Sequence, residues 1–293
     1  MDNNTFKAEL TGYIESLYLE FEKYQSDVFD TLVEFKRIAM LYDIPYYVVY
    51  GSLLGVYRDG DLLPWDYDID LVLSIEYKDV LLKALINDLN NEYYYCTALV
   101  QKDCRHYSIR ITKNGFNSSA VHLDIFFLIG APNDKRRREI FRKRIKWINR
   151  VRKIKLENYI EESMGQKALK YARILRKIYY KVIPINYLDR VYNKLENMVD
   201  YADAEFVTAM YAGADTYEKD ILNEGTTINI RGIEFMAPGK ILEFLDATYN
   251  DYEKLPPVES RFVEFYDSIN RLKYFEGGHA TKAKADWWKG SYK

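Results

Sequence analysis

The sequence predicts an α/β (α+β) protein whose core is a mixed β-sheet with helices, followed by a mainly helical region. Three observations predict this class. Short β-branched and aromatic runs alternate with amphipathic stretches through the first part of the chain, which is the pattern of alternating strands and helices. A Gly-Ser pair directly follows the first apolar run, and helical spacing dominates from residue 134 onward. We therefore predict a core over 1–133 and a mainly helical region over 134–293.

The first 133 residues supply the elements of the core. Apolar side chains recur every three or four residues between Leu10 and Ala39, which is the spacing of an amphipathic helix. In order, the pattern predicts a helix over 6–42, strands over 46–50 and 68–74, a helix over 76–90, strands over 92–100 and 106–112, and a strand over 120–127. The two strands before Asn114-Gly115 form a hairpin, so the sheet has about five strands.

The rest of the chain is divided by turn and break signals. Residues 134–198 have helical spacing, with Pro184 as a break. A hairpin is predicted over 226–236 with its turn at Arg231-Gly232, and a helix over 238–249. Residues 276–293 are rich in Gly and Lys and predict a mobile tail.

Composition limits the class of protein. Of 293 residues, 48% are hydrophobic and 29% are charged, as in a soluble globular protein. Cys96 and Cys104 are too few for a disulfide scaffold or a zinc cluster, and a reduced, cytoplasmic compartment fits them better. We expect no signal peptide, and no apolar run approaches the ~20 residues needed to span a bilayer.

Two aspartates form the strongest chemical signal. Asp68 and Asp70 alternate with Ile69 and Leu71, so in a strand both carboxylates lie on one face and the apolar side chains on the other. Two like charges side by side repel each other unless a cation lies between them. Oxygen ligands favour Mg²⁺ or Mn²⁺, so we predict a site for one of these ions.

The turn before this strand offers groups for a phosphate. Gly51 permits close approach of the backbone to a phosphate, and Ser52 can donate a hydrogen bond to it. Arg58 lies in the same segment, and its guanidinium can bind phosphate oxygens in a fork. The alternative is a solvated residue at a helix end. Trp65 packs under this loop. The alternative, a more specific role, is that it stacks on a cytosine base.

A further acid lies in the later apolar strand. Asp124 has mostly apolar neighbours, so it faces either a buried partner, such as Arg110, or a metal. With Asp68 and Asp70 upstream we favour the metal, or a role in taking the proton of an attacking hydroxyl. His122 shares the strand face of Asp124 and would orient it or contact a phosphate, although a lone His on a strand is more often structural.

Three patches carry a family resemblance. They are Gly51-Ser-Leu-Leu-Gly55 with Tyr57-Arg58, Pro64-Trp-Asp66 and Asp68-Ile-Asp70; Leu123-Asp-Ile-Phe126; and Tyr249-Asn-Asp-Tyr252 with Leu255-Pro-Pro257. The first patch resembles the core of the nucleotidyltransferase superfamily. Together they resemble the LicD family of phosphotransferases, which includes the fukutin-related proteins. Two positions depart from that family: Tyr67 stands where it usually has Asp, and Asn250 where it usually has Gly.

The resemblance implies a nucleotidyltransferase-like core and metal-dependent transfer of a substituted phosphoryl group. The donor would be a CDP-alcohol, with CDP-choline favoured. The acceptor would be a sugar hydroxyl of a cell-surface glycan, a lipid-linked glycan or a teichoic-acid precursor. Asp68, Asp70 and Asp124 would be both the metal ligands and the catalytic carboxylates. The residues expected at the substrate are Gly51, Ser52, Arg58, Trp65, Asp66, His122, Tyr249 and Tyr252.

Other functions stay open. Within the class, the group transferred would be glycerol phosphate, ribitol phosphate or phosphoethanolamine. A nucleotidyltransferase that moves a nucleoside monophosphate is a different enzymatic type, which releases pyrophosphate. A catalytically silent, membrane-associated scaffold is the alternative outside catalysis. The intact Asp68, Asp70 and Asp124 speak against the scaffold.

Residues 135–155 hold twelve Lys and Arg side chains and one acid. An apolar stripe at helical spacing runs along the segment: Ile140, Phe141, Ile145, Trp147, Ile148, Val151 and Ile154. A basic amphipathic helix of this kind is typical of peripheral contact with an anionic membrane, here its inner face. The alternative is a helix whose stripe is core and whose charges are solvated. No nucleic acid is expected, because the formal net charge of the chain is −2.

Tyr249 and Tyr252 are three residues apart, so on a helix they share a face. We expect the C-terminal element over 249–257 to close over the site and supply part of the substrate pocket. Aromatic faces with a carboxylate near by, here Asp251, suit the permanent positive charge of choline. The alternative is that both tyrosines are packing residues of a helical lid.

Overall fold

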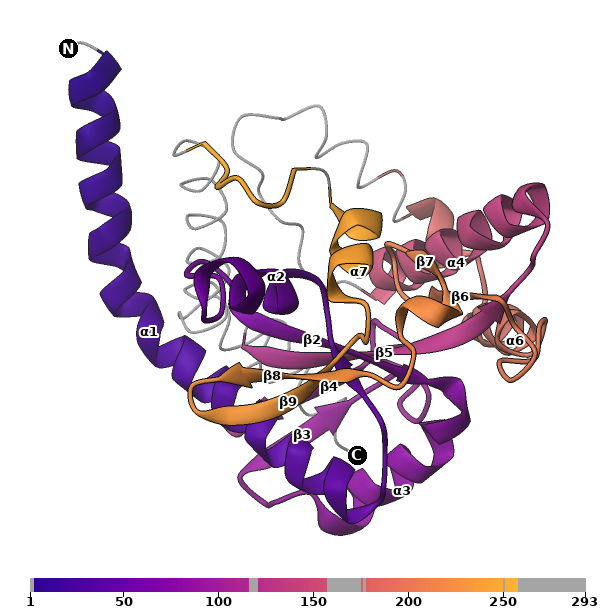
Figure 1. The fold of residues 1–293 in the computed structure, drawn as a ribbon. Helices are drawn as coiled ribbons and strands as arrows, with labels where there is room; N and C mark the ends of the chain where they lie inside the picture. The colour runs from indigo at the N-terminus through magenta and orange to yellow at the C-terminus, as the bar shows by residue number, and fades with distance from the viewer. Residues whose placement is uncertain (1–2, 116–120, 157–174, 176–177, 250, 258–293) are drawn as a thin grey trace.

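The computed structural model describes residues 3–115, 121–156, 175, 178–249 and 251–257. Within them it has the predicted mixed α/β architecture, with helices around a central sheet (Figure 1). The helices are α1 (Asn3–Leu41), α2 (Tyr50–Asp59), η1 (Ile75–Tyr77), α3 (Lys78–Asp88), α4 (Lys135–Leu156), α6 (Ile185–Glu196), η2 (Lys219–Ile221) and α7 (Ile241–Thr248). The strands are β1 (Tyr47–Val48), β2 (Asp68–Ser74), β3 (Tyr93–Cys96), β4 (Ile109–Lys113), β5 (His122–Ala131), β6 (Phe206–Ala209), β7 (Thr216–Glu218), β8 (Thr226–Ile230) and β9 (Ile233–Ala237).

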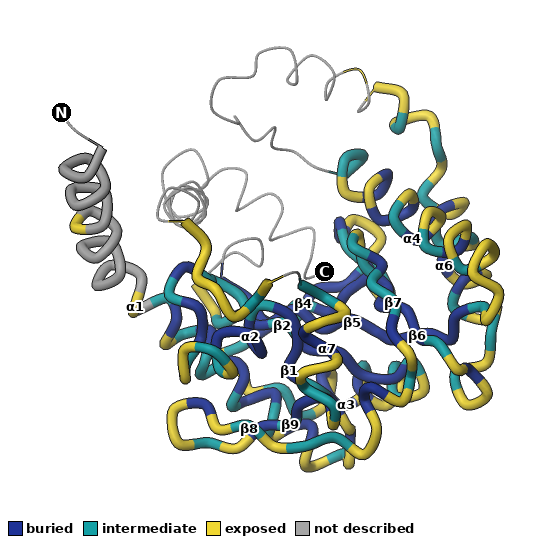
Figure 2. Tube along the Cα trace, turned by 45° about the horizontal axis from the view of Figure 1, so that its top comes forward, coloured by how far each residue is buried: buried dark blue, intermediate teal, exposed yellow. Residues whose placement is uncertain are grey.

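The sheet is built around β5. Its order is β1-β2-β5-β4-β3, and β6 and β7 extend it beyond the second half of β5. β2 and β5 run parallel, whereas the other pairs in this sheet are antiparallel. All ten residues of β5 are buried, and β2 and β5 pass through the buried centre of the molecule (Figure 2). A strand in this position places its side chains where both faces of the sheet are covered.

The two faces of the sheet have different surroundings. On one face, Ile69 and Leu71 pack with Leu32 and Phe35 of α1 in the largest hydrophobic cluster. On the other face, Val72 and Phe126 pack with residues of α2 and α7. Asp68 and Asp70 alternate with the α1-facing residues, so they lie on the α2 face. The predicted division of apolar and acidic side chains between the two faces is thus observed.

Several elements differ from the sequence-based expectation. The first strand ends at Val48, because Tyr50 already begins α2 with a backbone φ of 52°. β6 and β7 were not predicted, and β6 pairs with Leu128–Ala131, so strands from both sides of residue 133 build one sheet. The hairpin of β8 and β9 has its predicted turn, where Arg231 and Gly232 both have positive φ, as a tight two-residue turn requires. The predicted tail over 276–293 lies outside the described residues.

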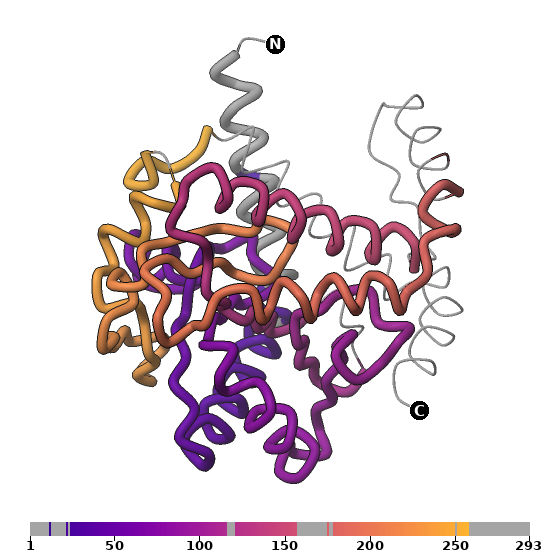
Figure 3. Tube along the Cα trace, turned by 90° about the vertical axis from the view of Figure 1, so that its right-hand side faces the viewer, coloured from indigo at the N-terminus to yellow at the C-terminus, as the bar shows by residue number. Residues whose placement is uncertain are grey.

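The basic helix α4 packs through its apolar stripe. Phe141, Ile145 and Ile148 are buried in a cluster with Tyr192 and Leu195 of α6, and the two helices run side by side (Figure 3). Much of the stripe is therefore core, whereas Ile140 and Trp147 are exposed. Contact with an anionic surface through the charged face of α4 stays a prediction. Within the described residues no helix has both the length and the apolar character to cross a bilayer.

Candidate active site

The site is built around a row of neighbouring side chains on β2, β5 and β4, which is called the acidic row below. Parallel pairing of β2 and β5 places Asp70 beside Asp124, and antiparallel pairing of β4 and β5 places Arg110 on the other side of Asp124. The same register sets Asp68 beside His122 one step along the face. Four of the predicted site residues, from two strands far apart in sequence, are thus brought together on the α2 face.

Asp124 is held by Arg110. Both Nε and Nη2 of Arg110 donate to Oδ2 of Asp124, at 3.0 and 2.8 Å. Burial alone would raise the pKa of Asp124, but Arg110 and His122 outweigh it and hold that pKa below its usual range. A carboxylate with a depressed pKa is a poor proton acceptor at neutral pH. The pairing that the sequence left as an alternative is therefore present, and a general-base role for Asp124 is not favoured.

Asp70 has the opposite electrostatics. Loss of contact with water raises its pKa, and the negative charges of Asp68, Asp124 and Asp66 raise it further, with Arg110 opposing them only in part. The second oxygen of Asp124, Oδ1, is buried and accepts no hydrogen bond from the described residues. Excess negative charge and a free carboxylate oxygen are what a site for a divalent cation offers. These features favour a divalent cation, but within the described residues the ligand oxygens of Asp68, Asp70 and Asp124 do not all lie within 4.8 Å of one another, so Mg²⁺ or Mn²⁺ at these residues stays a prediction.

His122 lies between two of these carboxylates. Its Nε2 is 3.4 Å from Oδ2 of Asp68 and 3.6 Å from Oδ2 of Asp124. Burial, followed by the charge of Arg110, lowers its pKa, so the ring is neutral at pH 7. The side chain is only 1% exposed. His122 is placed to orient the carboxylates and is too deeply buried to contact a substrate phosphate directly.

The start of α2 is joined to this row. The Ser52 hydroxyl oxygen accepts a hydrogen bond from the backbone N–H of Asp70 at 3.1 Å, and Ser52 is almost fully buried. A Cβ atom on Gly51 would lie 2.6 Å from Oδ2 of Asp66, so a larger residue here would require the Asp66 side chain to move. In the structure Gly51 and Ser52 thus join α2 to the acidic strand. The predicted contact of Ser52 with a phosphate stays a prediction beside this positioning role.

A cationic cavity adjoins the carboxylates. It has a volume of about 140 Å³ and lies between β4, β5, α4 and the segments around residues 105 and 211. Its charged lining residues are Arg105, Arg110, Lys153 and Asp124, with His106 and Asn149 among the others. The sequence analysis missed Arg105 and Lys153, because Lys153 is one of twelve basic residues in a single segment. Positive charge next to the acidic row suits a phosphate group.

Comparison with known proteins identifies the family. The model of the LicD/FKTN/FKRP nucleotidyltransferase domain matches residues 43–159, a range that contains the acidic row and Lys153. The lipopolysaccharide cholinephosphotransferase LicD of Haemophilus influenzae is 24% identical over 257 residues, which cover 78% of this chain and 89% of that protein. Residues 43–159 of the chain therefore form a LicD family domain. The ribitol 5-phosphate transferases FKRP of mouse (Mus musculus) and human (Homo sapiens) are each 52% identical over 33 residues, covering 11% of this chain and 7% of their own length.

The C-terminal element, residues 249 and 251–257, packs against the cluster of α2 and α7 on the same face of the sheet. Burial raises the pKa of Tyr249, and the negative charges of Asp70 and Asp66 add to that shift. The ring of Tyr252 meets that of Tyr57 edge-on at 6.0 Å. The expected helix at 249–252 is wrong, because α7 ends at Thr248 and Tyr249 is extended. The role of this element as a cover of the site stays a prediction.

Two other residues implied by the LicD resemblance have different surroundings from those expected. Arg58 pairs with the adjacent Asp59 at 2.7 Å, and its Nη1 donates to the backbone oxygen of Tyr252 at 3.4 Å. It therefore connects α2 to the C-terminal element, and a direct phosphate contact is not favoured. Trp65 is 9% exposed and belongs to the α1-facing core, so packing is correct and stacking on a base is not supported.

Proposed function

We propose that this protein, which has a LicD family domain, transfers a substituted phosphoryl group from a CDP-alcohol to a sugar hydroxyl. CDP-choline is the favoured donor, and a cell-surface glycan or teichoic-acid precursor the favoured acceptor. The observation that carries the proposal is the adjacency of the acidic row to the cationic cavity, with Asp124 and Arg110 common to both. A diphosphate donor needs cationic groups for its charge and a carboxylate for the proton of its acceptor. The choline relative supports this donor.

A divalent cation completes this proposal. Asp68, Asp70 and the free Oδ1 of Asp124 would hold Mg²⁺ or Mn²⁺, because all offer hard oxygen ligands. When bound, the ion would offset negative charge that develops on the leaving CMP. The protein contributes the fixed positions of these carboxylates, through Ser52 on one side and Arg110 on the other.

Proton transfer is the task of a carboxylate. In the proposed reaction the acceptor oxygen bonds to the β-phosphorus of the donor, and the bond from that phosphorus to CMP breaks. The hydroxyl proton then needs an acceptor. Asp70, whose pKa is raised, is better matched to this task than Asp124, whose pKa is lowered. Arg110 and Lys153 would hold phosphate oxygens from the cavity.

A panel of donors tests the proposal. The full chain is incubated with Mg²⁺ or Mn²⁺, a glycan acceptor and one of CDP-choline, CDP-glycerol, CDP-ribitol or CDP-ethanolamine. We expect release of CMP, fastest with CDP-choline. Preference for CDP-ribitol would favour the ribitol phosphate alternative, which the 52% identity over 33 residues supports. Release of pyrophosphate from nucleoside triphosphates, with no CMP from any CDP-alcohol, would overturn the proposal in favour of a nucleotidyltransferase.

The C-terminal tyrosines test donor selectivity. If Tyr249 and Tyr252 contact choline, replacing each with Leu should raise KM for CDP-choline roughly ten-fold, the equivalent of ~1.4 kcal/mol. KM for CDP-glycerol should change much less, because glycerol carries no positive charge. The control is Tyr187→Leu, at an exposed position on α6. Equal losses with both donors would show that the tyrosines only pack the cover.

A further inference from the structure

The acidic row continues one strand further and ends at a cysteine. Cys96 on β3 is paired with Arg110 on β4, so the order across the face is Asp70, Asp124, Arg110 and Cys96. Cys104 and His106 come from the connection between β3 and β4, which folds back over this end of the row. Within the described residues, these three form the one group of at least three His, Cys, Asp or Glu donors that lies within 4.8 Å of one another.

The donor atoms have the spacing of a metal site. Sγ of Cys104 is 3.7 Å from Nδ1 and 3.9 Å from Nε2 of His106. Around tetrahedral zinc, with bonds of about 2.3 Å to sulfur and 2.0 Å to nitrogen, sulfur and nitrogen ligands lie roughly 3.6 Å apart. Both cysteines are buried and reduced, and His106 is partly exposed. Because Sγ is almost equally far from both ring nitrogens, the His106 ring would turn to direct one nitrogen at an ion shared with the two sulfur atoms.

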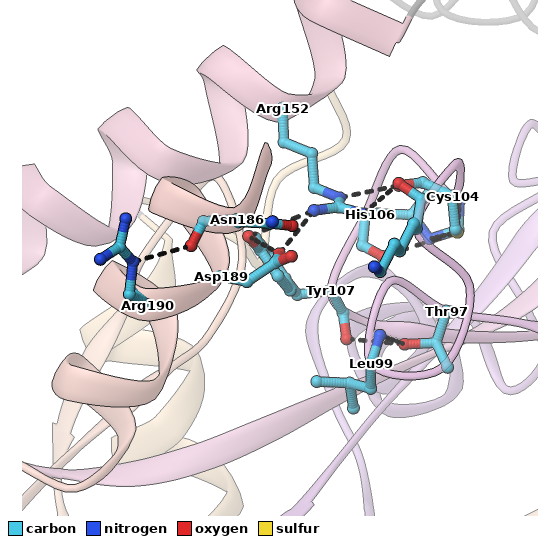
Figure 4. Close-up of polar contacts among 10 residues, drawn as sticks. Thr97, Leu99, Cys104, His106, Tyr107, Arg152, Asn186, Asp189 and Arg190 are labelled. Atoms are coloured by element: carbon cyan, nitrogen blue, oxygen red, sulfur yellow. Dashed lines mark hydrogen bonds and ion pairs between the residues drawn. The ribbon is translucent and has the colours of Figure 1, made fainter. Parts of the chain in front are cut away.

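Hydrogen bonds from α4 hold the connection between β3 and β4, which carries Cys104 and His106 (Figure 4). Arg152 of α4 is fully buried, and it donates to the backbone oxygens of Cys104 and Lys102, each at 2.7 Å. Its Nη1 also pairs with Asp189 of α6 at 2.7 Å. On the strand side, the N–H of Ala98 donates to the backbone oxygen of His106 at 2.8 Å. These hydrogen bonds hold the ligand residues in place before an ion binds. The outer partners of metal ligands commonly do this.

We propose that Cys96, Cys104 and His106 bind one Zn²⁺, with water in the fourth position. Two thiolates and an imidazole are soft and borderline ligands, which select zinc over Mg²⁺. The site is therefore chemically distinct from the carboxylate site, although both lie on one row. Two thiolates neutralise the charge of the ion. The bound ion fixes the connection that carries Arg105 and His106, and through them one wall of the cationic cavity.

The sequence alone does not predict this site, because neither its two cysteines nor its three histidines are sufficient by themselves for a zinc site. The spacing of Cys96, Cys104 and His106 also differs from the paired Cys-x-x-Cys arrangement that signals zinc in a sequence. The three ligands converge only because the antiparallel pairing of β3 and β4 returns the chain to Cys96.

Metal content of the purified full chain tests the proposal without reference to transfer activity. Under reducing conditions, we expect one Zn²⁺ per chain by elemental analysis. Co²⁺ in place of Zn²⁺ should give the intense absorption of a cobalt–thiolate bond. Cys104→Ser and His106→Ala should each weaken zinc binding, measured by competition with a chromophoric chelator, ~100-fold or more, since loss of even a supporting residue costs ~10–100-fold.

The matched control is Asp70→Asn, which should keep the zinc and the cobalt–thiolate spectrum. The cobalt spectrum of the unaltered protein decides the question even if a variant does not fold. Three results would overturn the proposal: a protein that takes up no zinc when it is supplied, zinc binding unchanged in a folded Cys104→Ser variant, or a Cys96–Cys104 disulfide in the purified protein. Because none of these readouts uses a donor, failure here is distinguishable from failure of the proposed transfer reaction.

Discussion

Replacing Asp70 with Asn is expected to abolish transfer while the protein stays folded. The carboxylate of Asp70 would serve as a ligand for the cation and as the proton acceptor, so its loss should lower turnover by ~1,000-fold or more. The substitution keeps the size of the side chain and leaves the N–H that donates to Ser52 in place. Asp68→Asn should have a similar effect on turnover, since Asp68 is the paired carboxylate on the same face of β2.

Stability distinguishes this expectation from simple damage to the fold. The pKa of Asp70 is raised in the folded protein, so its ionised form destabilises the fold at neutral pH. Without a metal, Asp70→Asn should therefore hold or raise the melting temperature. Added Mg²⁺ should stabilise the unaltered protein more than the variant. The control is Asp79→Asn, at an exposed position on α3, which should keep full activity. Near-normal turnover of Asp70→Asn at saturating Mg²⁺ would remove the cation hypothesis.

Replacing Asp124 with Asn should cause the largest loss of stability. The side chain of Asp124 is 5% exposed and that of Arg110 is 17% exposed, so the variant removes the buried negative charge that Asp124 places beside the Arg110 guanidinium. Breaking such a buried pair from one side costs about 3 kcal/mol or more. We expect a decrease of that size in the free energy of unfolding, measured by urea denaturation, with turnover reduced more than ~100-fold.

A second substitution separates the two roles of Asp124. In Arg110→Met with Asp124→Asn, neither buried charge remains, so much of the lost stability should return. Activity should not return, because both the carboxylate and the guanidinium of the cavity wall are absent. If Asp124→Asn alone has the stability of the unaltered protein, the ion pair contributes little to the fold. If the double variant regains turnover, Asp124 has no part in the reaction.

The acidic strand was predictable because its signal is local. Asp68 and Asp70 alternate with apolar residues, and that alternation alone places both on one face. The turn at Arg231-Gly232 was predictable for the same reason. β6 was not, because Phe206–Ala209 is a short strand whose partner is the second half of β5. No pattern within four residues reveals a partner so far away in sequence.

A local sequence pattern also could not predict which charged residues lie together or what covers the apolar face of a helix. Lys153 resembles its basic neighbours in sequence, and only the packing of α4 places it in the cavity beside Asp124. The apolar stripe of α4 has the same spacing whether it faces a membrane or the protein interior. Its partner, α6, begins at Ile185, and without that helix the stripe would have no obvious cover. Periodicity establishes that a face is apolar, whereas tertiary structure decides what covers it.

The position of β5 has a consequence for how this chain can be shortened. Leu128–Ala131 are buried and pair with β6. A fragment that ends at residue 133, or one limited to the family domain over 43–159, would lack β6 and expose an apolar edge with open backbone groups. Such edges promote self-association. The second fragment would also lack α1, whose side chains cover the opposite face. The range that matches the family domain is therefore smaller than the unit that folds, and truncations should retain both α1 and β7.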